Sequence, residues 1–409
     1  MDIIDMLHDK AQWQRFCDYK FQGGHLSQEE EADLLAFVQQ EQYREPVQII
    51  RNGECFAPPR MAQISKAHSQ KKRTVFLFPR EENYVLKFLT FLLQERYDHL
   101  FAPNLYSFRP GTGVRDAIHA ITGRQGIKNL WCYKADIQNY FNSIPVEKLL
   151  PVLEEALVDQ PDILRFLKLL LTDPQAERDG QLLEIQKGIM AGCPVSTFLA
   201  NLYLSHLDRY FHNTNVLYAR YSDDIILFAD SREMLERHIR MVHSTLADAG
   251  LLINSSKEQI SAPGEPWVFL GIIYQNGIID VAPVSVEKLK AKMHRKVRAL
   301  VRWQARKQTT GAQTAKAFIR AFRRKLFCND CEHELTWTRW YFPLITTAES
   351  LHAIDLYAQE CIRYLVTGTR TKARYNCRYE DMKALGYVSL VHCYYAHLRF
   401  PENSQETVD

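Results

Sequence analysis

The chain has 409 residues, of which 46% are hydrophobic and 24% charged, and this composition excludes collagen-like, mucin-like and wholly disordered proteins. No apolar run reaches the roughly 20 residues of a membrane-spanning helix, and the acidic N-terminus lacks the basic and apolar parts of a secretory signal. Nine cysteines on so long a chain favour reduced thiols over a disulfide framework. We therefore expect a cytoplasmic protein of two or three domains, with no membrane partner.

Positive charge is concentrated in one stretch. Between Lys288 and Lys325 the chain has 14 Lys or Arg and no Asp or Glu, so that, with a net charge of +3, all other residues sum to −11. Apolar residues such as Trp303 and Phe318 interrupt the charges, which allows helices with one packed face and one charged face. A merely solvated basic face is the alternative interpretation. The density of charge favours contact with nucleic-acid phosphates.

The predicted elements mix helices and strands, and an acidic, helix-prone opening (residues 1–43) comes first. Strands are expected at 74–80, at 131–137, around a polar tip within 216–230, and in a hairpin at 267–280 whose turn is Asn276-Gly277. Helices are expected at 81–100, 114–122, 146–171, 197–211 and 231–250. Strands give way to basic helices at Pro283, which marks the expected domain boundary.

Acidic residues gather at two predicted strand ends. Asp223 and Asp224 lie at the hairpin tip between the apolar runs VLYARY and IILFA, where adjacent carboxylates repel each other and lose solvation. A local turn role is the alternative interpretation of such a pair. Asp136, however, ends a further apolar run. Three carboxylates at strand ends favour Mg²⁺, and two ions about 3.5–4 Å apart would clamp both oxygens of a phosphoryl transfer.

Six motifs follow one another in a characteristic order. They are SFRPGTGVRDAI (107–118), ADIQNYFNSI (135–144), KGIMAGCPVSTFLANLYL (187–204), YSDDIILFA (221–229), GLLINSSK (250–257) and FLGIIY (269–274). In this order and spacing they resemble the motifs of reverse transcriptases, and more closely those of bacterial enzymes related to group II intron proteins. The resemblance covers about residues 66–284, and the basic helices follow where that family has its thumb.

The resemblance implies an α/β (α+β) right-hand polymerase with fingers, a ferredoxin-like palm and an α-helical basic thumb. The expected parts are a helical N-terminal extension (1–65), fingers (66–130), a palm (131–284) that encloses a further fingers segment (about 146–195), the thumb (285–345) and a helical tail (346–409).

The resemblance also implies a reaction and its metal ligands. Asp136 and Asp223 would hold two Mg²⁺ ions, with Mn²⁺ as the alternative, and Asp224 would assist them. The carbonyl of Ile137 would help to bind the metal-bridged triphosphate. A primer 3′-hydroxyl would attack the α-phosphate of a dNTP on an RNA template, so that cDNA grows and pyrophosphate leaves.

Other residues correspond to the nucleotide pocket of the family. Phe141 would exclude a ribose 2′-hydroxyl, although simple core packing is the alternative. Arg73 and Arg80 would grip the triphosphate, because guanidinium groups match phosphate oxygens, or would be ordinary surface charges. Lys257 would stabilise the leaving pyrophosphate or face solvent. Gly192 follows an alanine where many intron-type enzymes have glutamine, so nucleotide selection would depend more on backbone packing there.

The thumb would bind the template–primer duplex through its phosphates, with little dependence on base sequence. The residues expected to make these contacts are Lys292, Arg295, Lys296, Arg302, Arg320, Arg323 and Arg324.

A zinc site is the alternative for one short cysteine motif. Cys328 and Cys331 have a spacing common among zinc ligands, and His333 follows them. A structural site needs four ligands, and the remaining candidates, Cys361 and Cys377, are distant and unpaired in the sequence. We therefore expect no zinc site there.

The residues indicate the chemistry of the family more clearly than they indicate which branch of the family this chain resembles. We recognise no endonuclease module with paired cysteines after the basic stretch. In this organisation the chain resembles stand-alone bacterial reverse transcriptases that copy a dedicated noncoding RNA in antiphage defence. A retron enzyme, a diversity-generating enzyme and a maturase-like RNA-binding protein are the alternatives, and a homo-oligomer is compatible with all of them. The three acids favour an enzyme, because carboxylates alone would repel bound phosphate.

Overall fold

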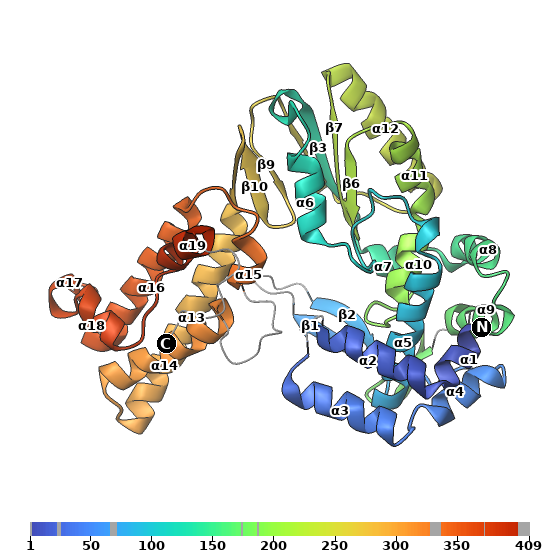
Figure 1. Cartoon of the computed structure of the whole chain (residues 1–409), viewed down its shortest axis with the longest axis horizontal. Helices are drawn as coiled ribbons and strands as arrows, with labels where there is room; N and C mark the ends of the chain where they lie inside the picture. Colours follow the sequence, from blue (N-terminus) through green and yellow to red (C-terminus); the bar gives the residue numbers. More distant parts are fainter. Residues whose placement is uncertain are drawn as a thin grey trace. The chain divides into compact units, whose positions relative to one another are not determined.

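A computed structural model describes residues 2–22, 26–65, 72–172, 175–185, 188–327, 337–371 and 373–399 of the chain. The chain divides into two compact units. The first spans Met1–Gln22 and Gln28–Glu265, and the second spans Pro266–Asp409 together with Gly23–Ser27. Figure 1 shows the helices and strands of both units.

Four helices open the first unit and surround a buried aromatic cluster. Trp13 is fully buried, and its ring centroid lies 4.5 Å from that of Phe88 and 5.1 Å from that of Tyr43. Phe88 belongs to α5 (Arg80–Arg96), so the cluster joins the opening helices to the helix that follows the first two strands. The opening helices are α1 (Ile3–His8), α2 (Lys10–Gln22), α3 (Gln28–Gln39) and α4 (Arg44–Arg51).

The first sheet of this unit has four strands in the order β2-β1-β4-β5. Because β1 pairs with β2 along its whole length, residues 60–65 belong to this sheet rather than to the helical extension predicted for residues 1–65. The strands are β1 (Arg60–Ser65), β2 (Lys72–Leu77), β4 (Gln175–Arg178) and β5 (Gln181–Glu184), and the helices α8 (Val146–Ala156) and α9 (Pro161–Thr172) precede β4.

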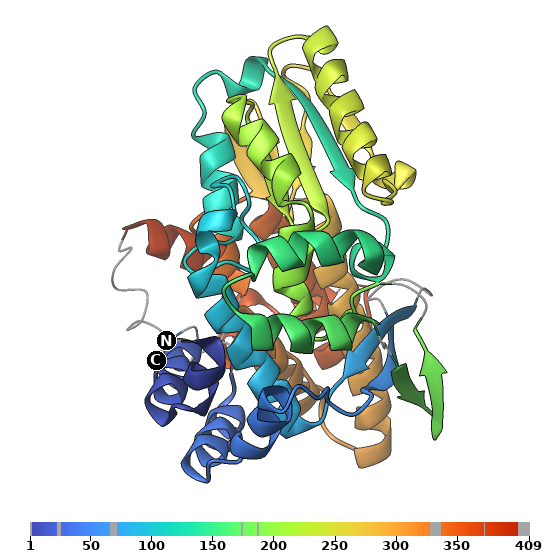
Figure 2. The ribbon, with the colours of Figure 1, turned by 90° about the vertical axis from the view of Figure 1, so that its right-hand side faces the viewer.

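The second sheet of the first unit lies in the region predicted as the palm. Its four strands are antiparallel and follow the order β6-β7-β3-β8. Every residue of β7 after its first is buried, which accounts for the continuous apolar run IILFA. α12 packs against β3 and β7, and α6 and α11 pack against β6 (Figure 2). The bounds are β3 (Trp131–Asp136), β6 (Tyr218–Tyr221), β7 (Asp224–Ala229), β8 (Gln259–Ser261), α6 (Val114–Thr122), α11 (Ser205–Asn213) and α12 (Arg232–Asp248).

The apolar helix predicted at 197–211 is interrupted. α10 (Ser196–Tyr203) ends before Leu204, and α11 starts after it. The carbonyl of Asn201, in the last turn of α10, accepts a hydrogen bond from Arg220 Nη2 at 3.3 Å. A side chain from the neighbouring sheet therefore satisfies a carbonyl at the place where the helix breaks.

The second unit begins with a three-stranded sheet in the order β11-β10-β9, made of β9 (Trp267–Phe269), β10 (Ile272–Gln275) and β11 (Ile278–Val281). Asn276-Gly277 forms the predicted turn, with positive φ at both residues. The division between the units lies at Glu265–Pro266, earlier than the predicted Pro283, because this sheet shares hydrogen bonds with the later chain: Thr346 N–H donates to the Ile279 carbonyl at 2.8 Å.

Helices make up the rest of the second unit. α13 (Pro283–Lys307), α14 (Gly311–Leu326) and α16 (Glu349–Thr367) pack on one another around buried side chains such as Met293 and Phe318. α13 has proline at its start and α14 a capping box of Thr310 and Gln313. Shorter helices are α15 (Trp337–Tyr341), α17 (Ala373–Asn376), α18 (Tyr379–Ala384) and α19 (Leu390–Arg399). In the described part of the chain, no helix combines the length and apolar character that crossing a bilayer requires.

Candidate active site

The three predicted acids meet at one end of the second sheet. Asp136 is the last residue of β3 and pairs directly with Asp224, the first residue of β7. Paired residues of antiparallel strands have Cα atoms about 5 Å apart. Just beyond this pair, the Ile137 N–H donates to the Asp223 carbonyl at 2.9 Å. The sheet register therefore brings together carboxylates that are distant in the sequence.

The turn that carries Asp223 has a strained backbone. Only Ser222 and Asp223 lie between β6 and β7, and Ser222 has φ of 60°, a left-handed conformation that costs a serine about 1 kcal/mol or more. Two side chains hold it there. The Ser222 N–H donates to Ser107 Oγ at 2.8 Å, and Arg220 Nη1 donates to the Ser222 carbonyl at 3.3 Å. Both polar groups of the strained residue are thereby satisfied.

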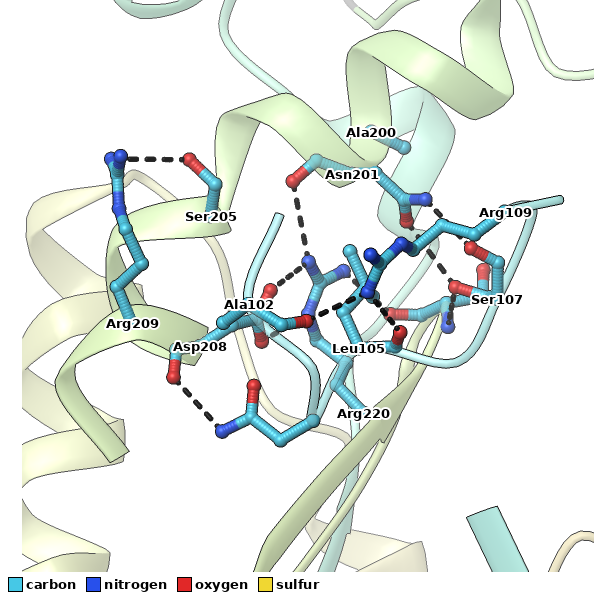
Figure 3. Close-up of polar contacts among 12 residues, drawn as sticks. Ala102, Leu105, Ser107, Arg109, Ala200, Asn201, Ser205, Asp208, Arg209 and Arg220 are labelled. Carbon is cyan, nitrogen blue, oxygen red and sulfur yellow. Dashed lines mark hydrogen bonds and ion pairs between the residues drawn. The ribbon is translucent and has the colours of Figure 1, made fainter. Parts of the chain in front are cut away.

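A buried ion pair stabilises the turn at Ser222 and Asp223. Arg220 and Asp208 are each fully buried, and Nη2 and Nε of the guanidinium lie 2.5 and 2.8 Å from the two carboxylate oxygens (Figure 3). Burial alone would lower the pKa of Arg220, but the Asp208 carboxylate outweighs it and raises that pKa above its usual value. Tyr218 Oη donates a further hydrogen bond to Asp208 at 2.9 Å. Two strand residues and one helix residue are thus locked together.

The motif SFRPG completes the same network. Asn201 Nδ2 donates to the Ser107 carbonyl at 2.7 Å, and Ser107 Oγ donates to Asn201 Oδ1 at 3.2 Å (Figure 3). Arg109 donates to the Leu105 and Ala102 carbonyls, at 3.1 and 2.8 Å. The loop that contains Ser107 is therefore fixed to both α10 and the turn at Ser222 and Asp223. We call Ser107, Asn201, Asp208, Arg220 and Ser222 the turn-support network.

A large pocket opens beside the acids within the first unit. Its volume is about 1160 Å³, more than most small-molecule sites provide, and room enough for a nucleotide together with part of a strand. Asp136, Ile137 and Asp223 line it. Its other walls come from α5 and the end of β2, from the loop at 191–194 and from the segment at 254–257. Helix, sheet and loop thus converge on two carboxylates.

The electrostatics of the acids favour a cation. Burial raises the pKa of Asp224 to about 6. The Lys134 ammonium opposes this rise, and the nearby carboxylates of Asp223 and Asp136 add to it. Lys134 Nζ lies 3.8 Å from Asp224 Oδ1, and Lys257 Nζ lies 2.5 Å from Asp136 Oδ1. Partial burial lowers the pKa of Lys257, but the hydrogen bond to Asp136 outweighs it and raises that pKa. Two ammonium groups thus balance a repulsive acidic cluster.

The available oxygen atoms fit Mg²⁺. Among the described residues, no three His, Cys, Asp or Glu side chains are close enough together to form a metal-binding group by themselves. Mg²⁺, however, is often bound by one or two carboxylates together with substrate phosphates and water. Asp136 and Asp223 line one pocket and supply two such carboxylates. Asp224 does not line the pocket, and its carboxylate lies next to the Lys134 ammonium. The site therefore suits an ion that arrives with a phosphate-bearing substrate.

Phe141 and Gly192 also line this pocket. The Phe141 ring lies edge-on to that of Phe108, with centroids 6.3 Å apart. Gly192 has φ of 104°, and a Cβ placed there would come within 3.0 Å of the Phe76 carbonyl. Next to it, the Phe76 N–H donates to the Ala191 carbonyl at 2.9 Å. Only glycine therefore fits this close approach of the loop to β2.

Arg80 lies differently from its predicted role. Its guanidinium donates to both Asp33 oxygens, at 2.7 and 2.8 Å, and to Gln42 Oε1 at 2.9 Å, and it does not line the pocket. A grip on a triphosphate does not fit this arrangement, because the side chain joins α5 to α3 instead. The side chain of Arg73, on β2, lies outside the described residues.

Two residues of α5 that the sequence did not single out face the pocket. They are Asn83 and Lys87. Burial lowers the pKa of Lys87, and its ammonium lies 5.3 Å from the centroid of the Tyr84 ring. A lysine within the apolar run of 85–93 was the available signal, since such a charge needs either solvent or a ligand.

The basic residues predicted to bind a duplex lie on α13 and α14 of the second unit. Lys292 and Arg323 are partly buried, and the others, Arg295, Lys296, Arg302, Arg320 and Arg324, are exposed. Burial, followed by the nearby Lys325 ammonium, lowers the pKa of Lys292. Two neighbouring ammonium groups repel each other, so binding of an anion between them would be favourable.

The candidate zinc ligands of the sequence fall only partly within the described residues. Cys328, Cys331 and His333 lie outside the described residues. Cys361 and Cys377 are buried, and burial raises the pKa of Cys361 to about 12 and that of Cys377 as well.

Comparison with protein families identifies one match. Residues 64–274 match the family model described as reverse transcriptase (RNA-dependent DNA polymerase). This range includes the whole second sheet of the first unit and, except for the first residues of β1, the first sheet, together with the acids and the turn-support network.

Curated relatives match over shorter segments. The chain is 33% identical over 164 residues to the 91 kDa protein in the cob intron of Schizosaccharomyces pombe, a segment covering 39% of this chain and 19% of that protein. It is 31% identical over 107 residues to the retron Ec86 reverse transcriptase of Escherichia coli, covering 25% of this chain and 33% of that enzyme. The chain thus matches a third or less of the length of either relative.

Solved structures give distant matches. Telomerase from Candida albicans in complex with a fragment of telomeric RNA has a TM-score of 0.44 and 11% identity, covering 87% of this chain and 71% of that chain. Apo telomerase from Candida tropicalis has a TM-score of 0.45 and 13% identity, covering 81% and 68%.

Proposed function

Because the chain belongs to the reverse transcriptase (RNA-dependent DNA polymerase) family, we propose that it extends a primer with deoxynucleotides on an RNA template. The observation that carries this proposal is the pairing of Asp136 with Asp224 beside Asp223, at the wall of a pocket of about 1160 Å³. A protein that only bound RNA would gain nothing from three carboxylates at this point, because they repel phosphate.

The proposed cofactor is a pair of Mg²⁺ ions, with Mn²⁺ as the alternative. Asp136 and Asp223 would hold them, Asp224 would assist, and the Ile137 carbonyl would face the triphosphate. When bound, the ions would activate the primer 3′-hydroxyl and neutralise charge on the leaving pyrophosphate. The turn-support network would keep the Asp223 carboxylate in place, since a small displacement of a catalytic group reduces the rate strongly.

Other residues of the first unit would position the nucleotide. Phe141 would lie against the sugar and exclude a 2′-hydroxyl. Lys257, released from Asp136 when the cations bind, would meet the pyrophosphate. Lys87 would add a positive charge at the fingers side of the pocket, the role that the sequence had assigned to Arg80.

The basic residues of α13 and α14 would bind the phosphates of the template–primer duplex. The template in this proposal is a structured noncoding RNA, read in the cytoplasm as part of antiphage defence. The motif order and the similarity to the retron Ec86 reverse transcriptase over 107 residues support an enzyme that copies RNA. A retron-type or diversity-generating enzyme would use the same site with another template.

Primer extension on an RNA template with Mg²⁺ tests the chemistry. Wild type is compared with the double variant Asp223→Asn plus Asp224→Asn, which we expect to lose extension while still binding RNA. A matched control, Asp179→Asn plus Asp230→Asn, removes two exposed carboxylates outside the pocket and should extend as wild type does.

Two results would defeat the proposal. One is a wild-type protein that incorporates no dNTP on any template, including the RNA that co-purifies with it. The other is a double variant as active as wild type. RNA binding without extension would instead support the maturase-like alternative.

A further inference from the structure

A second pocket lies within the second unit, outside the residues assigned so far. Its volume is about 300 Å³, the lower end of the range for ligand sites. It is bordered by α13, by α16, by Arg370 and by the first residues of α17. The residues that give it chemical character are His294, Tyr357, Arg363, Tyr364, Arg370 and Arg374.

Three guanidinium groups give this pocket a positive charge, against one carboxylate, that of Glu360. Arg363 is 9% exposed and is fixed by donating to the Cys377 carbonyl and to Gln359 Oε1, both at 3.3 Å. Arg370 and Arg374 are exposed, and neither is ion-paired with another described residue. Two arginines therefore remain available for an anion such as phosphate.

Aromatic rings supply a flat surface next to these charges. The Arg370 guanidinium lies over the Tyr364 ring, 5.4 Å from its centroid, and Tyr357 lines the same pocket. An aromatic ring with an arginine over it is a platform on which a nucleobase stacks. Base and phosphate recognition thus coincide in a pocket that one nucleotide would fill and that a duplex could not enter.

The same chemistry continues outside the pocket. α17 and α18 follow one another beside the end of α16 (Figure 1). Tyr375 is 81% exposed, Tyr379 is 36% exposed, and Lys383 Nζ lies 5.0 Å from the Tyr379 ring centroid. Exposed tyrosines alternating with Arg374 and Arg378 are typical of surfaces that bind several nucleotides in a row.

We propose that the α16–α17 pocket binds one unpaired nucleotide of a single-stranded RNA. Its base lies against Tyr357 and the Arg370–Tyr364 pair, and its phosphate contacts Arg370 and Arg374. The surface along α17 and α18 carries the adjoining nucleotides, which favours a strand over a free nucleotide. The choice of RNA rests on the proposed function, whereas the pocket is lined by residues of the second unit that do not take part in that chemistry.

Binding of a 5′-fluorescein-labelled 15-nucleotide oligouridine, followed by anisotropy with the full chain, tests the proposal. The double variant Arg370→Ala plus Arg374→Ala should weaken binding about tenfold. The control Arg237→Ala plus Arg240→Ala removes two exposed charges from α12 and should weaken it less than twofold. Equal losses in both variants would overturn the proposal, because the effect would then be one of net charge alone.

Photocrosslinking locates the strand independently of affinity. An oligouridine with one 4-thiouridine should give adducts in the tryptic peptides 340–363 and 364–370, which contain Tyr357 and Tyr364. Adducts confined to other peptides would overturn the proposal. Tight binding of the fluorescent nucleotide etheno-AMP that the double variant loses would also overturn it, in favour of a free nucleotide.

The outcome is separable from that of the proposed polymerase activity. A wild type that binds and crosslinks the oligomer through this pocket but never extends a primer would refute the polymerase and leave this pocket in place. A protein that extends primers normally, yet shows no pocket-dependent binding, would refute only the pocket.

Discussion

Arginine serves two opposite purposes in the two units of this protein. In the turn-support network, Arg220 is fully buried and both its Nε and Nη2 bind Asp208. In the α16–α17 pocket, Arg370 is exposed and lies over a tyrosine ring. The first arginine holds the turn that carries Asp223, and the second is available to a ligand. Burial and pairing, rather than residue type, distinguish a charge that shapes a site from one that binds at it.

The largest expected effect comes from breaking the buried pair. Asp208→Ala leaves the Arg220 charge buried without its partner and should lower the free energy of unfolding by about 3–5 kcal/mol, measured by urea denaturation. The control is Asp162→Ala, which removes an exposed ion pair with Arg165 and should cost less than about 1 kcal/mol. Similar losses in both variants would erase the distinction between buried and exposed charges.

The exposed positive charges of the second unit should make the affinity for nucleic acid depend on salt concentration. If α13 and α14 neutralise about six phosphates, affinity for a template–primer duplex should fall on the order of 10³-fold between 50 and 200 mM salt. Lys296→Ala plus Arg302→Ala should make the dependence shallower by about two charges. A flat dependence in wild type would remove the assignment of these helices to duplex binding.

The serine beneath the turn should affect turnover more than binding. Ser107→Ala deprives the Ser222 N–H of its acceptor, and we expect kcat to fall about tenfold with little change in KM for dNTP. Ser107→Thr keeps the hydroxyl and should recover part of the loss. An equal change in kcat and in stability, with no recovery by threonine, would indicate a purely structural role.

The smallest expected effect concerns a half-buried carboxyl group with one buried oxygen that has no hydrogen-bond partner among the described residues. Glu82, on α5, has one oxygen that no described residue hydrogen-bonds, and burial raises its pKa to about 7. Since the folded state favours the protonated form, stability is retained at low pH and lost as pH rises through 7. Glu82→Gln should therefore stabilise the protein by about 1 kcal/mol at pH 8, after allowance for solvent screening, and by much less at pH 5. Thermal unfolding at both pH values measures the difference, and an equal effect at both would contradict the assignment.

Local sequence patterns predicted the strands and turns that depend on residues close together in the chain. The hairpin around Asp223, the strand ending at Asp136 and the Asn276-Gly277 turn were all readable, because strand runs and turn residues are neighbours in the chain. The meeting of Asp136 with Asp224 followed from the family resemblance.

Contacts between distant residues were not predictable in the same way. The partner of Arg80, Asp33, lies on another helix 47 residues earlier, and nothing beside Arg80 in the sequence indicates it. The pairing of Asp208 with Arg220 depends on how α11 packs against β6. An arginine inside the apolar run VLYARY was the one visible sign that a buried counter-ion was needed.

The register of β3 with β7 makes the proposed activity depend on correct strand pairing during folding. Since side chains alternate between the two faces of a strand, sliding β3 by a single position would turn Asp136 to the opposite face and away from its partner acid. If the proposed function holds, a molecule with this shifted register would lack the paired acids and would therefore be inactive rather than slower.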